Sequence, residues 1–208
     1  MNLKKLENNI YYIPISNKME TILNLDKSLF LFFNSLHTKW LDHFFYVITN
    51  TWVWIPLYSY VIYLTYKKWG KKTIFILLFL VGGLFITDQS CNLLKNSTQR
   101  LRPSREVELA DQIHLYQKSD GTHYKAGKFS FPSAHSANSM LFAVFIIIFI
   151  ANKRKWIIGA AILWSLMLGY SRIYLGVHYP FDVLTGFTLG LIIGYPLFYF
   201  GRKWVSKQ

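Results

Sequence analysis

Long segments without a charged side chain constrain the fold of this chain more than any other feature. Residues 44–66, 129–152, 156–171 and 183–201 contain no Lys, Arg, Asp or Glu, and residues 73–94 contain only Asp88. A helix needs about 20 apolar residues, with a range of about 17–25, to cross the hydrocarbon core of a bilayer. We therefore expect an all-α protein, a polytopic membrane helix bundle with five clear spanning segments.

A sixth apolar stretch, residues 28–36, is too short to span the membrane on its own. It fits an amphipathic helix over residues 26–43 that lies in the interface, so residues 1–43 are expected to be interfacial or extramembrane. The first 20 residues have no apolar core before a cleavage site and do not resemble a secretory signal. We expect one domain over residues 1–208, with five or six spanning helices plus the N-terminal interfacial helix.

The net charge of +13 is distributed in a way that is typical of membrane topology signals. Residues 67–72, 153–155 and 202–207 carry Lys and Arg but no acidic residue, whereas the loop 96–128 mixes acidic with basic residues. The positive-inside rule places the first three segments in the cytoplasm and the long loop, with the turn 174–180, outside. A multi-pass protein of the cytoplasmic membrane is therefore expected, and nucleic acid is not an expected partner. The single cysteine, Cys91, excludes an internal disulfide and fits a packed thiol.

Two cations mark the first of three polar segments at the outer ends of the predicted spans. Lys95 and Arg102 are seven residues apart, which predicts that they share one helix face, and Pro103 would then end or redirect that helix. Two cations on one face suit a phosphoryl dianion. Contact with lipid headgroups by snorkelling side chains explains this segment alone equally well.

The second segment combines a helix cap with a histidine. Ser133 has the character of an N-cap, and the third span would begin directly after it. Helix N-termini attract anions through free N–H groups and a partial positive charge. His135 falls in that first turn, next to Ala134. Taken alone, this pattern is more often a cap with an incidental histidine.

The third segment pairs a histidine with a carboxylate. His178 and Asp182 are four residues apart at a predicted helix start, and Arg172 closes the preceding helix. A carboxylate that holds one imidazole nitrogen leaves the other free and more basic, as a nucleophilic or general-base histidine requires. A purely structural hydrogen bond is as common for such a pair. The topology places all three segments on one membrane face, which favours a shared site.

In order and spacing, these residues resemble the phosphatidic acid phosphatase type 2 superfamily. Its signature, Lys-x6-Arg-Pro, Pro-Ser-x-His and Ser-Arg-x5-His-x3-Asp, is complete between Lys95 and Asp182, with Ala134 where Gly is usual. Similar members act on phosphatidate, phosphatidylglycerophosphate, undecaprenyl diphosphate or lipid A. The pattern is specific for the superfamily and weak for the substrate. Soluble relatives are vanadate haloperoxidases, and the membrane segments disfavour that activity here.

The resemblance implies a role for each matching residue. His178 would attack phosphorus and form a phosphohistidine, Asp182 would orient it, and His135 would protonate the leaving oxygen and then activate water. The phosphoryl oxygens would be held by three cations, a hydroxyl and a backbone N–H: Lys95, Arg102, Arg172, Ser133 and Ala134. Because three cations already surround the phosphate, no metal and no cofactor is expected, in line with phosphoryl transfer by charge stabilisation and positioning.

The expected function is that of a metal-independent integral membrane lipid phosphatase with its site on the outer face. Undecaprenyl diphosphate and lipid A are the preferred substrates. A phosphotransferase with the same phosphohistidine and a non-catalytic membrane protein are the alternatives. The expected partners are the lipid and the bilayer, with no obligate protein partner. Polar residues of the long loop are expected to shape headgroup choice: Glu106, Glu108, Asp111, His114 and His123.

Asp88 is the one acidic residue inside a predicted span, where an ionised carboxylate costs about 2.5–3.5 kcal/mol. Such residues usually face the bundle interior and have a partner. Asp88, Lys95 and Arg102 are spaced by sevens, which predicts one common helix face. We expect Asp88 to support the site from below, by accepting hydrogen bonds from a site cation or from polar groups on spans three to five. A bond within the bundle that only aids folding is the alternative.

Overall fold

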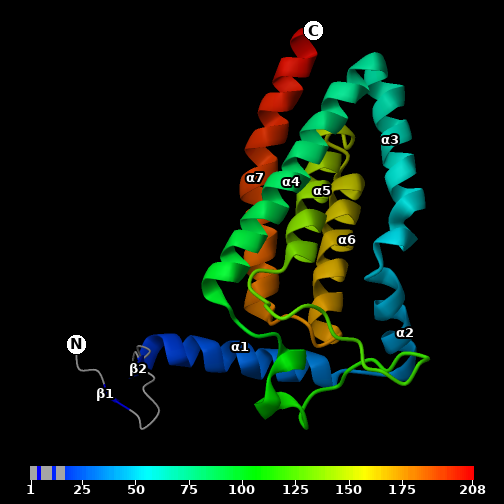
Figure 1. Ribbon diagram of the computed structural model, residues 1–208. Coiled ribbons are helices and arrows are strands. Elements are labelled where there is room, and N and C mark those ends of the chain that lie inside the picture. Colours follow the sequence, from blue (N-terminus) through cyan, green and yellow to red (C-terminus); the bar gives the residue numbers. More distant parts are fainter. Residues whose placement is uncertain (1–3, 6–10, 13–16) are drawn as a thin grey trace.

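The computed structural model describes residues 4–5, 11–12 and 17–208. Two short strands, β1 (Lys4–Lys5) and β2 (Tyr11–Tyr12), pair antiparallel, and helices form all the elements that follow. The prediction that residues 1–20 are not a cleaved signal falls largely outside the described residues. Among the described residues, five helices run side by side as a bundle (Figure 1): α3 (Ile55–Trp69), α4 (Thr73–Thr98), α5 (Ala134–Phe149), α6 (Lys155–Tyr174) and α7 (Pro180–Lys207).

Within the described residues, three stretches are long and apolar enough to cross a membrane: Thr51–Thr98, Lys155–Tyr174 and Pro180–Lys207. The first is 48 residues long and folds back on itself, because Gly70 has a φ of 55° and η2 (Gly70–Lys72) turns the chain from α3 into α4. The two helices form a hairpin (Figure 1). The all-helical bundle predicted from the uncharged segments is thus confirmed.

Helix α5 is shorter, with 16 residues, and lies in the middle of the bundle against α4, α6 and α7. The side chains of Leu141, Phe145 and Phe149 are fully buried. The backbones of α5 and α7 are in direct contact. If Gly186 carried a Cβ, that atom would lie 2.4 Å from the Ser133 carbonyl oxygen, and a Cβ at Gly190 would lie 2.3 Å from the Ala137 carbonyl oxygen. Small residues at four-residue intervals permit such close approach in membrane bundles. The N-terminus of α5 is therefore held directly against the first turns of α7.

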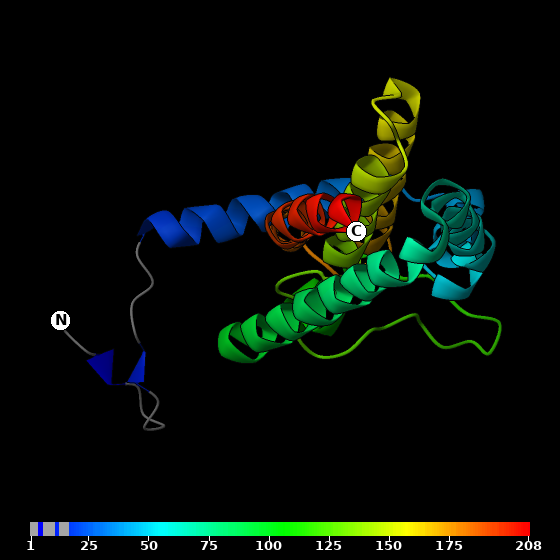
Figure 2. The same cartoon turned by 90° about the horizontal axis from the view of Figure 1, so that it is seen from above.

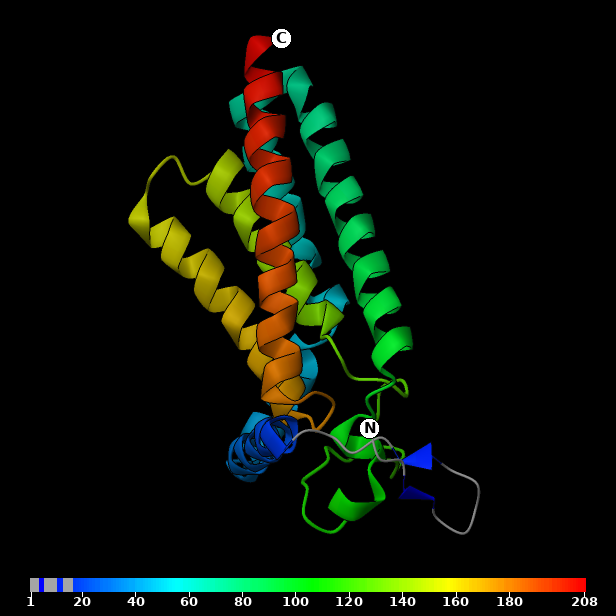
Figure 3. The same cartoon turned by 90° about the vertical axis from the view of Figure 1, so that its left-hand side faces the viewer.

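The N-terminal region differs from the prediction. Instead of one helix over residues 26–43, the chain forms α1 (Asn17–Ser35) and α2 (Lys39–Ile48). Thr38 separates them because its side chain accepts the Leu41 N–H and caps α2. Figures 2 and 3 show α1 lying across the end of the bundle rather than along it.

The predicted first span, residues 44–66, also has different bounds. Its first residues belong to α2, and η1 (Thr51–Trp54) comes before α3. Asn50 caps this turn by accepting the Trp52 N–H, and Pro56 favours a new helix start because its ring fixes φ and it has no N–H to satisfy. These start signals divide an uncharged segment that composition alone presents as continuous.

The basic segments meet at one end of the bundle, as the charge pattern predicts. Lys68 Nζ donates to the Phe149 carbonyl at 2.8 Å, and Arg202 Nη1 donates to that of Ile148 at 2.6 Å. Cations at the C-terminus of α5 satisfy its last carbonyl groups and the negative end of its dipole. The long loop, the turn between α6 and α7, and α1 lie at the opposite end (Figures 1 and 3).

Candidate active site

The three polar segments predicted from the sequence converge at the end of the bundle that holds the long loop. They come from the last turns of α4 and the chain after it, the start of α5, and the turn between α6 and α7. His135 is close enough to Arg172, His178, Arg102 and Lys95 for their charges to act on it. The structure therefore brings both histidines and all three predicted phosphate-binding cations into one region.

The path of the chain between the two cations of the first segment corrects the sequence prediction. Lys95 is in α4, but the helix ends at Thr98, and Gln99 adopts a left-handed conformation with its N–H bonded to the Lys95 carbonyl at 2.9 Å. Arg102 has extended backbone dihedrals, outside the helix. The prediction of one shared helix face for Asp88, Lys95 and Arg102 is wrong, because pairing of Leu101 with Phe129 redirects the chain before Pro103.

Arg102 reaches the site from this extended segment. Its side chain is buried, and Nη1 donates to the Val177 carbonyl at 3.0 Å and contacts His178 Nε2 at 2.9 Å. Burial, and then the charge of Arg172, lowers the pKa of Arg102 to about 10. The guanidinium therefore keeps its proton at neutral pH.

His178 is held in a tight turn after α6. Its N–H and that of Val177 both donate to the Arg172 carbonyl, at 3.2 and 3.1 Å, and Gly176 provides the positive φ of 72° that the turn requires. A guanidinium only donates, so Nε2 accepts from Arg102 and Nδ1 carries the ring proton. Burial, followed by the charges of Arg102 and Arg172, lowers the pKa of His178 well below its ordinary value. The ring is a neutral base at neutral pH.

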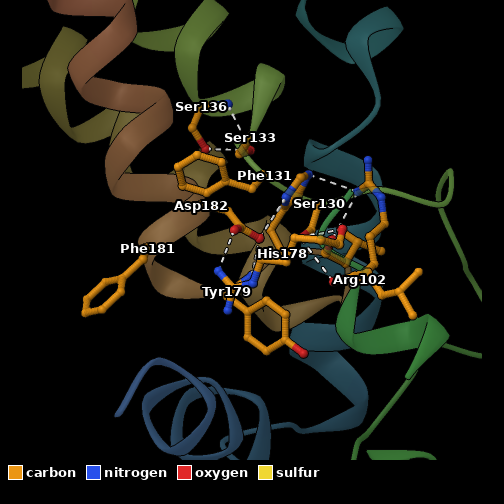
Figure 4. A network of polar contacts seen from close by, with 12 residues as sticks. Arg102, Ser130, Phe131, Ser133, Ser136, His178, Tyr179, Phe181 and Asp182 are labelled. Atoms are coloured by element: carbon orange, nitrogen blue, oxygen red, sulfur yellow. Dashed lines mark hydrogen bonds and ion pairs between the residues drawn. The ribbon is translucent and has the colours of Figure 1, made fainter. Parts of the chain in front are cut away.

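Asp182 faces the protonated nitrogen of that ring. Its Oδ2 lies 3.5 Å from His178 Nδ1 and accepts the Tyr179 N–H at 2.9 Å (Figure 4). This second bond satisfies the N-cap of α7 in the manner of a capping box, with Asp182 at the third helical position. The carboxylate is fully buried. Asp182 thus lies beside the neutral His178 ring, as predicted, at a contact distance that is too long for a strong hydrogen bond.

Ser133 caps α5, as predicted. Its Oγ accepts the Ser136 N–H at 3.4 Å and the Ser136 hydroxyl at 2.9 Å, and its own N–H donates to the Asp182 carbonyl at 2.9 Å (Figure 4). The first N–H groups of a helix have no partner within the helix, so Ala134 and His135 begin an anion-attracting terminus. Ser133 thus links the helix start that carries His135 to the residue that faces His178.

Arg172 is held by two residues that sequence reasoning missed. Its Nη1 donates to the Thr49 hydroxyl at the end of α2 and to the Tyr124 hydroxyl, the latter at 3.2 Å. Thr49 and Tyr124 are far from the motifs in sequence, and no spacing pattern identifies them. The arginine itself is buried in the last turn of α6.

Asp88 has a partner on α5, one of the elements from which a partner is predicted. Asn138 Nδ2 donates to Asp88 Oδ1 at 2.9 Å, and Asn138 lies three residues after His135. The bond joins Asp88 to the helix that carries His135, and a supporting role for Asp88 in catalysis stays a prediction.

A largely apolar groove begins beside this part of the site. It has a volume of about 400 Å³, and its polar lining includes His135, Asp88 and Asn138, along with Thr49, Thr51 and Ser139. From there it extends between α3, α4, α5 and α6 along aliphatic and aromatic side chains that include Tyr58, Val61, Leu80, Leu84, Phe142, Phe145 and Trp164. The cationic region therefore adjoins an apolar space between the helices.

The loop residues predicted to shape headgroup choice have different surroundings. Glu108 pairs with Lys27 of α1 at 3.3 Å, and His114 contacts Asp42 of α2 at 2.9 Å and stacks on His37. These two residues attach the loop to the N-terminal helices. The side chain of Glu106 interacts with Tyr179, while Asp111 and His123 are exposed.

A charge bridge behind Asp182 was also missed. Arg100 contacts both Asp182 and Asp26 of α1. Arg100 stands between the two cations of the first segment, and this proximity is the one signal in the sequence that could have found it.

The chain is similar to known proteins over most of its length. The model of the PAP2 superfamily matches residues 71–206. The lipid A 4'-phosphatase of Bacteroides thetaiotaomicron is 35% identical over 91% of this chain and 82% of that protein, and the lipid A 4'-phosphatase of Porphyromonas gingivalis is 33% identical over 91% and 80%. Among solved structures, Aquifex aeolicus LpxE superposes with a TM-score of 0.61 at 26% identity, over 83% of this chain and 94% of that one. A transmembrane PAP2 type phosphatidylglycerolphosphate phosphatase from Bacillus subtilis has the same fold, with a TM-score of 0.65 at 24% identity and coverage of 88% and 87%.

Proposed function

The chain belongs to the PAP2 superfamily, and on that premise we propose that it is a lipid A-type phosphatase that works through a phosphohistidine at the outer face of the cytoplasmic membrane. It is a multi-pass membrane lipid phosphatase. The observation that carries the proposal is the junction of a cationic phosphate site with an apolar groove of about 400 Å³ at His135. A phosphorylated headgroup and an acyl chain can occupy these two regions together.

His178 acts as the nucleophile. Its Nε2 lone pair forms the bond to phosphorus, and the phosphate oxygens replace His178 as the partner of the Arg102 guanidinium. Nδ1 keeps its proton and faces Asp182, so the positive charge that develops on the imidazole is stabilised by a carboxylate. The bond from phosphorus to the leaving oxygen breaks as the new bond forms.

His135 acts as the acid and then the base. In its protonated form it gives a proton to the leaving oxygen, and the resulting neutral imidazole then removes one from the water that attacks the phosphohistidine, which releases inorganic phosphate. Lys95, Arg102 and Arg172 stabilise the negative charge of the transferring group, together with the Ser133 hydroxyl and the Ala134 N–H at the start of α5. Because the three cations supply the positive charge that phosphoryl transfer needs, the proposed reaction requires no metal ion.

The orientation follows from the charge distribution. We infer five spans, α3 to α7, with α1 and α2 at the outer interface and the basic segments 67–72, 153–155 and 202–207 in the cytoplasm. Exposed apolar side chains along α1, such as Met19, Ile22 and Phe32, suit a helix that lies in the interface.

Cysteine labelling tests this orientation. Cys91 is buried, so exposed cysteines introduced by Ser119→Cys in the loop and Arg154→Cys at the other end are the reactive sites. A membrane-impermeant thiol reagent should label Ser119→Cys in intact cells and leave Arg154→Cys unlabelled until the membrane is opened. The reverse pattern would place the site in the cytoplasm.

A lipid panel tests the activity. Purified protein in detergent, without added metal, is given lipid A, undecaprenyl diphosphate, phosphatidylglycerophosphate and phosphatidate, and phosphate release is measured. We expect the fastest release from lipid A and none from the His178→Gln variant. When the substrate phosphate is radiolabelled, an acid-labile, alkali-stable phosphoryl group should be found on the wild-type protein after the reaction is quenched. Preference for another lipid would replace the substrate assignment, and an active His178→Gln protein would refute the mechanism.

A further inference from the structure

We propose that Asp26 and Arg100 are positioning residues for the His178–Asp182 pair, acting through a buried charge bridge that makes α1 part of the active site. The proposal rests on the assignment of His178 as nucleophile and Asp182 as its partner. Asp26 lies outside the three signature segments. Arg100 lies within the first segment, at a position that the signature does not define.

The bridge consists of two carboxylates that share one guanidinium. Arg100 Nη1 lies 2.8 Å from Asp182 Oδ1, and Arg100 Nη2 lies 2.8 Å from Asp26 Oδ2. Both carboxylates are fully buried, and the arginine side chain is 19% exposed. The planar fork of the guanidinium fixes the position of each carboxylate relative to the other.

The two oxygens of Asp182 have separate partners. Oδ1 contacts Arg100, whereas Oδ2 accepts the Tyr179 N–H and faces His178 Nδ1. Arg100 therefore limits rotation of the carboxylate and keeps Oδ2 directed at the imidazole. Figure 4 shows Asp182 between the Tyr179 backbone and the His178 ring.

Arg100 is poorly placed to act as a further phosphate ligand. Each of its terminal nitrogens is already beside a carboxylate, and its guanidinium lies over the Tyr179 ring, 3.9 Å from the centroid. The phosphate-binding cations differ in this respect, since Arg102 contacts the nucleophilic nitrogen itself. The effect of Arg100 on the reaction therefore passes through Asp182.

The charge of the bridge suits the proposed reaction. With both carboxylates ionised, the two carboxylates and one guanidinium carry a net charge of −1 in a buried region next to His178. When Nε2 bonds to phosphorus, the imidazole becomes positive because Nδ1 keeps its proton, and the leaving oxygen takes its proton from His135. The excess negative charge stabilises that state, and Arg100 lowers the repulsion between the two buried carboxylates.

Asp26 connects this arrangement to the interfacial helix. Its Oδ1 accepts the N–H of Phe181, the second residue of α7, at 2.9 Å, so a residue of α1 satisfies a free N–H at the start of α7, next to the bond that Asp182 makes. Helix α1 crosses the end of the bundle at this point (Figure 1). Docking of α1 and orientation of Asp182 therefore depend on the same two side chains.

The test compares Asp26→Asn, Arg100→Gln and Arg100→Lys with a matched control, Lys27→Gln. Lys27 follows Asp26 on α1 and pairs with Glu108 of the same loop, but that pair is exposed. We expect kcat to fall about 10–100-fold in Asp26→Asn and Arg100→Gln, with KM changed less than about 3-fold, because neither residue touches substrate. Arg100→Lys should recover part of kcat, and Lys27→Gln should match the wild type. The rate of phosphoenzyme formation should fall with kcat.

Three results would overturn the proposal. The first is a kcat within about 3-fold of wild type in folded Asp26→Asn or Arg100→Gln protein. The second is a rise in KM with kcat unchanged, which would make Arg100 a substrate ligand. The third is a loss of activity that is fully explained by a lower yield of folded protein in every variant, including Arg100→Lys. Activity in His178→Gln would instead refute the proposed function, so the two failures are distinguishable.

Discussion

Replacing Gly186 with alanine tests how tightly the position of the α5 N-terminus controls the reaction. Gly186 lies on α7, one turn after Asp182, against the start of α5. A Cβ there would lie 2.4 Å from the Ser133 carbonyl oxygen, 3.0 Å from Ser136 Cβ and 3.2 Å from the Ala137 nitrogen. Ordinary contact begins at 3.4 Å. The two helices must therefore separate by about 1 Å, because a backbone oxygen cannot rotate away as a side chain can.

The consequence reaches the site through Ser133. Its carbonyl accepts the Ala137 N–H at 3.0 Å, and its N–H donates to the Asp182 carbonyl at 2.9 Å, so the displacement moves the cap of α5 relative to the residue that faces His178. A misplacement of about 1 Å can cost about 100-fold in rate. Overpacking of this kind costs about 1–3 kcal/mol of stability. We expect kcat/KM to fall about 30–100-fold and the melting temperature in detergent to decrease.

Gly82→Ala is the control. A Cβ at Gly82 on α4 meets nothing within 4 Å, so this change should leave activity unaltered and gain up to about 1 kcal/mol of helix propensity. Phosphate release and thermal unfolding are measured for both variants in the same detergent. Activity within about 3-fold of wild type in Gly186→Ala would refute the link between this helix contact and catalysis.

Further predictions concern metal, pH and Asp88. Activity should survive EDTA and be inhibited by vanadate, which adopts the five-coordinate geometry of phosphoryl transfer; a strict requirement for Mg²⁺ in the release assay would contradict the mechanism. Because burial and the nearby guanidinium groups lower the pKa of His178, its imidazole stays unprotonated below its ordinary pKa of about 6.5. After correction for titration of the substrate phosphate, kcat/KM should fall on the acid side with a midpoint below about pH 6.5. A midpoint above that pH would refute this reasoning. Asp88→Asn should fold normally but lower kcat if the bond to Asn138 supports the site, whereas normal turnover in the stable variant would leave a folding role alone.

The sequence by itself determined the helical bundle and the end at which the site lies. Charged groups and unsatisfied backbone are costly in hydrocarbon, so a long uncharged segment becomes a helix almost regardless of its neighbours. Successive spans alternate direction, and this places the polar segments around Lys95, Ser133 and His178 at one end. The cap at Ser133 is equally local, because it depends on a side chain and the N–H groups of the next turn.

Helix boundaries near the site depended on contacts between distant segments. Seven-residue spacing placed Lys95 and Arg102 on one helix face, yet the left-handed Gln99 and the pairing of Leu101 with Phe129 end the helix earlier. Likewise, the predicted helix over residues 26–43 divides at Thr38. The spacing of residues along a sequence shows which side chains share a face while a helix continues. It does not show where contacts with distant segments end the helix.

Only the tertiary structure decided which buried charges pair. Arg100 and Asp182 are 82 residues apart in the chain and meet at 2.8 Å, and Asp26 joins them from the interfacial helix. The strength and specificity of such contacts come from the loss of water around both partners and from the fixed geometry of the guanidinium. Charge type and spacing are properties of a local sequence, whereas burial is a property of the whole fold, so the partners of Asp182 became identifiable only once the helices were packed.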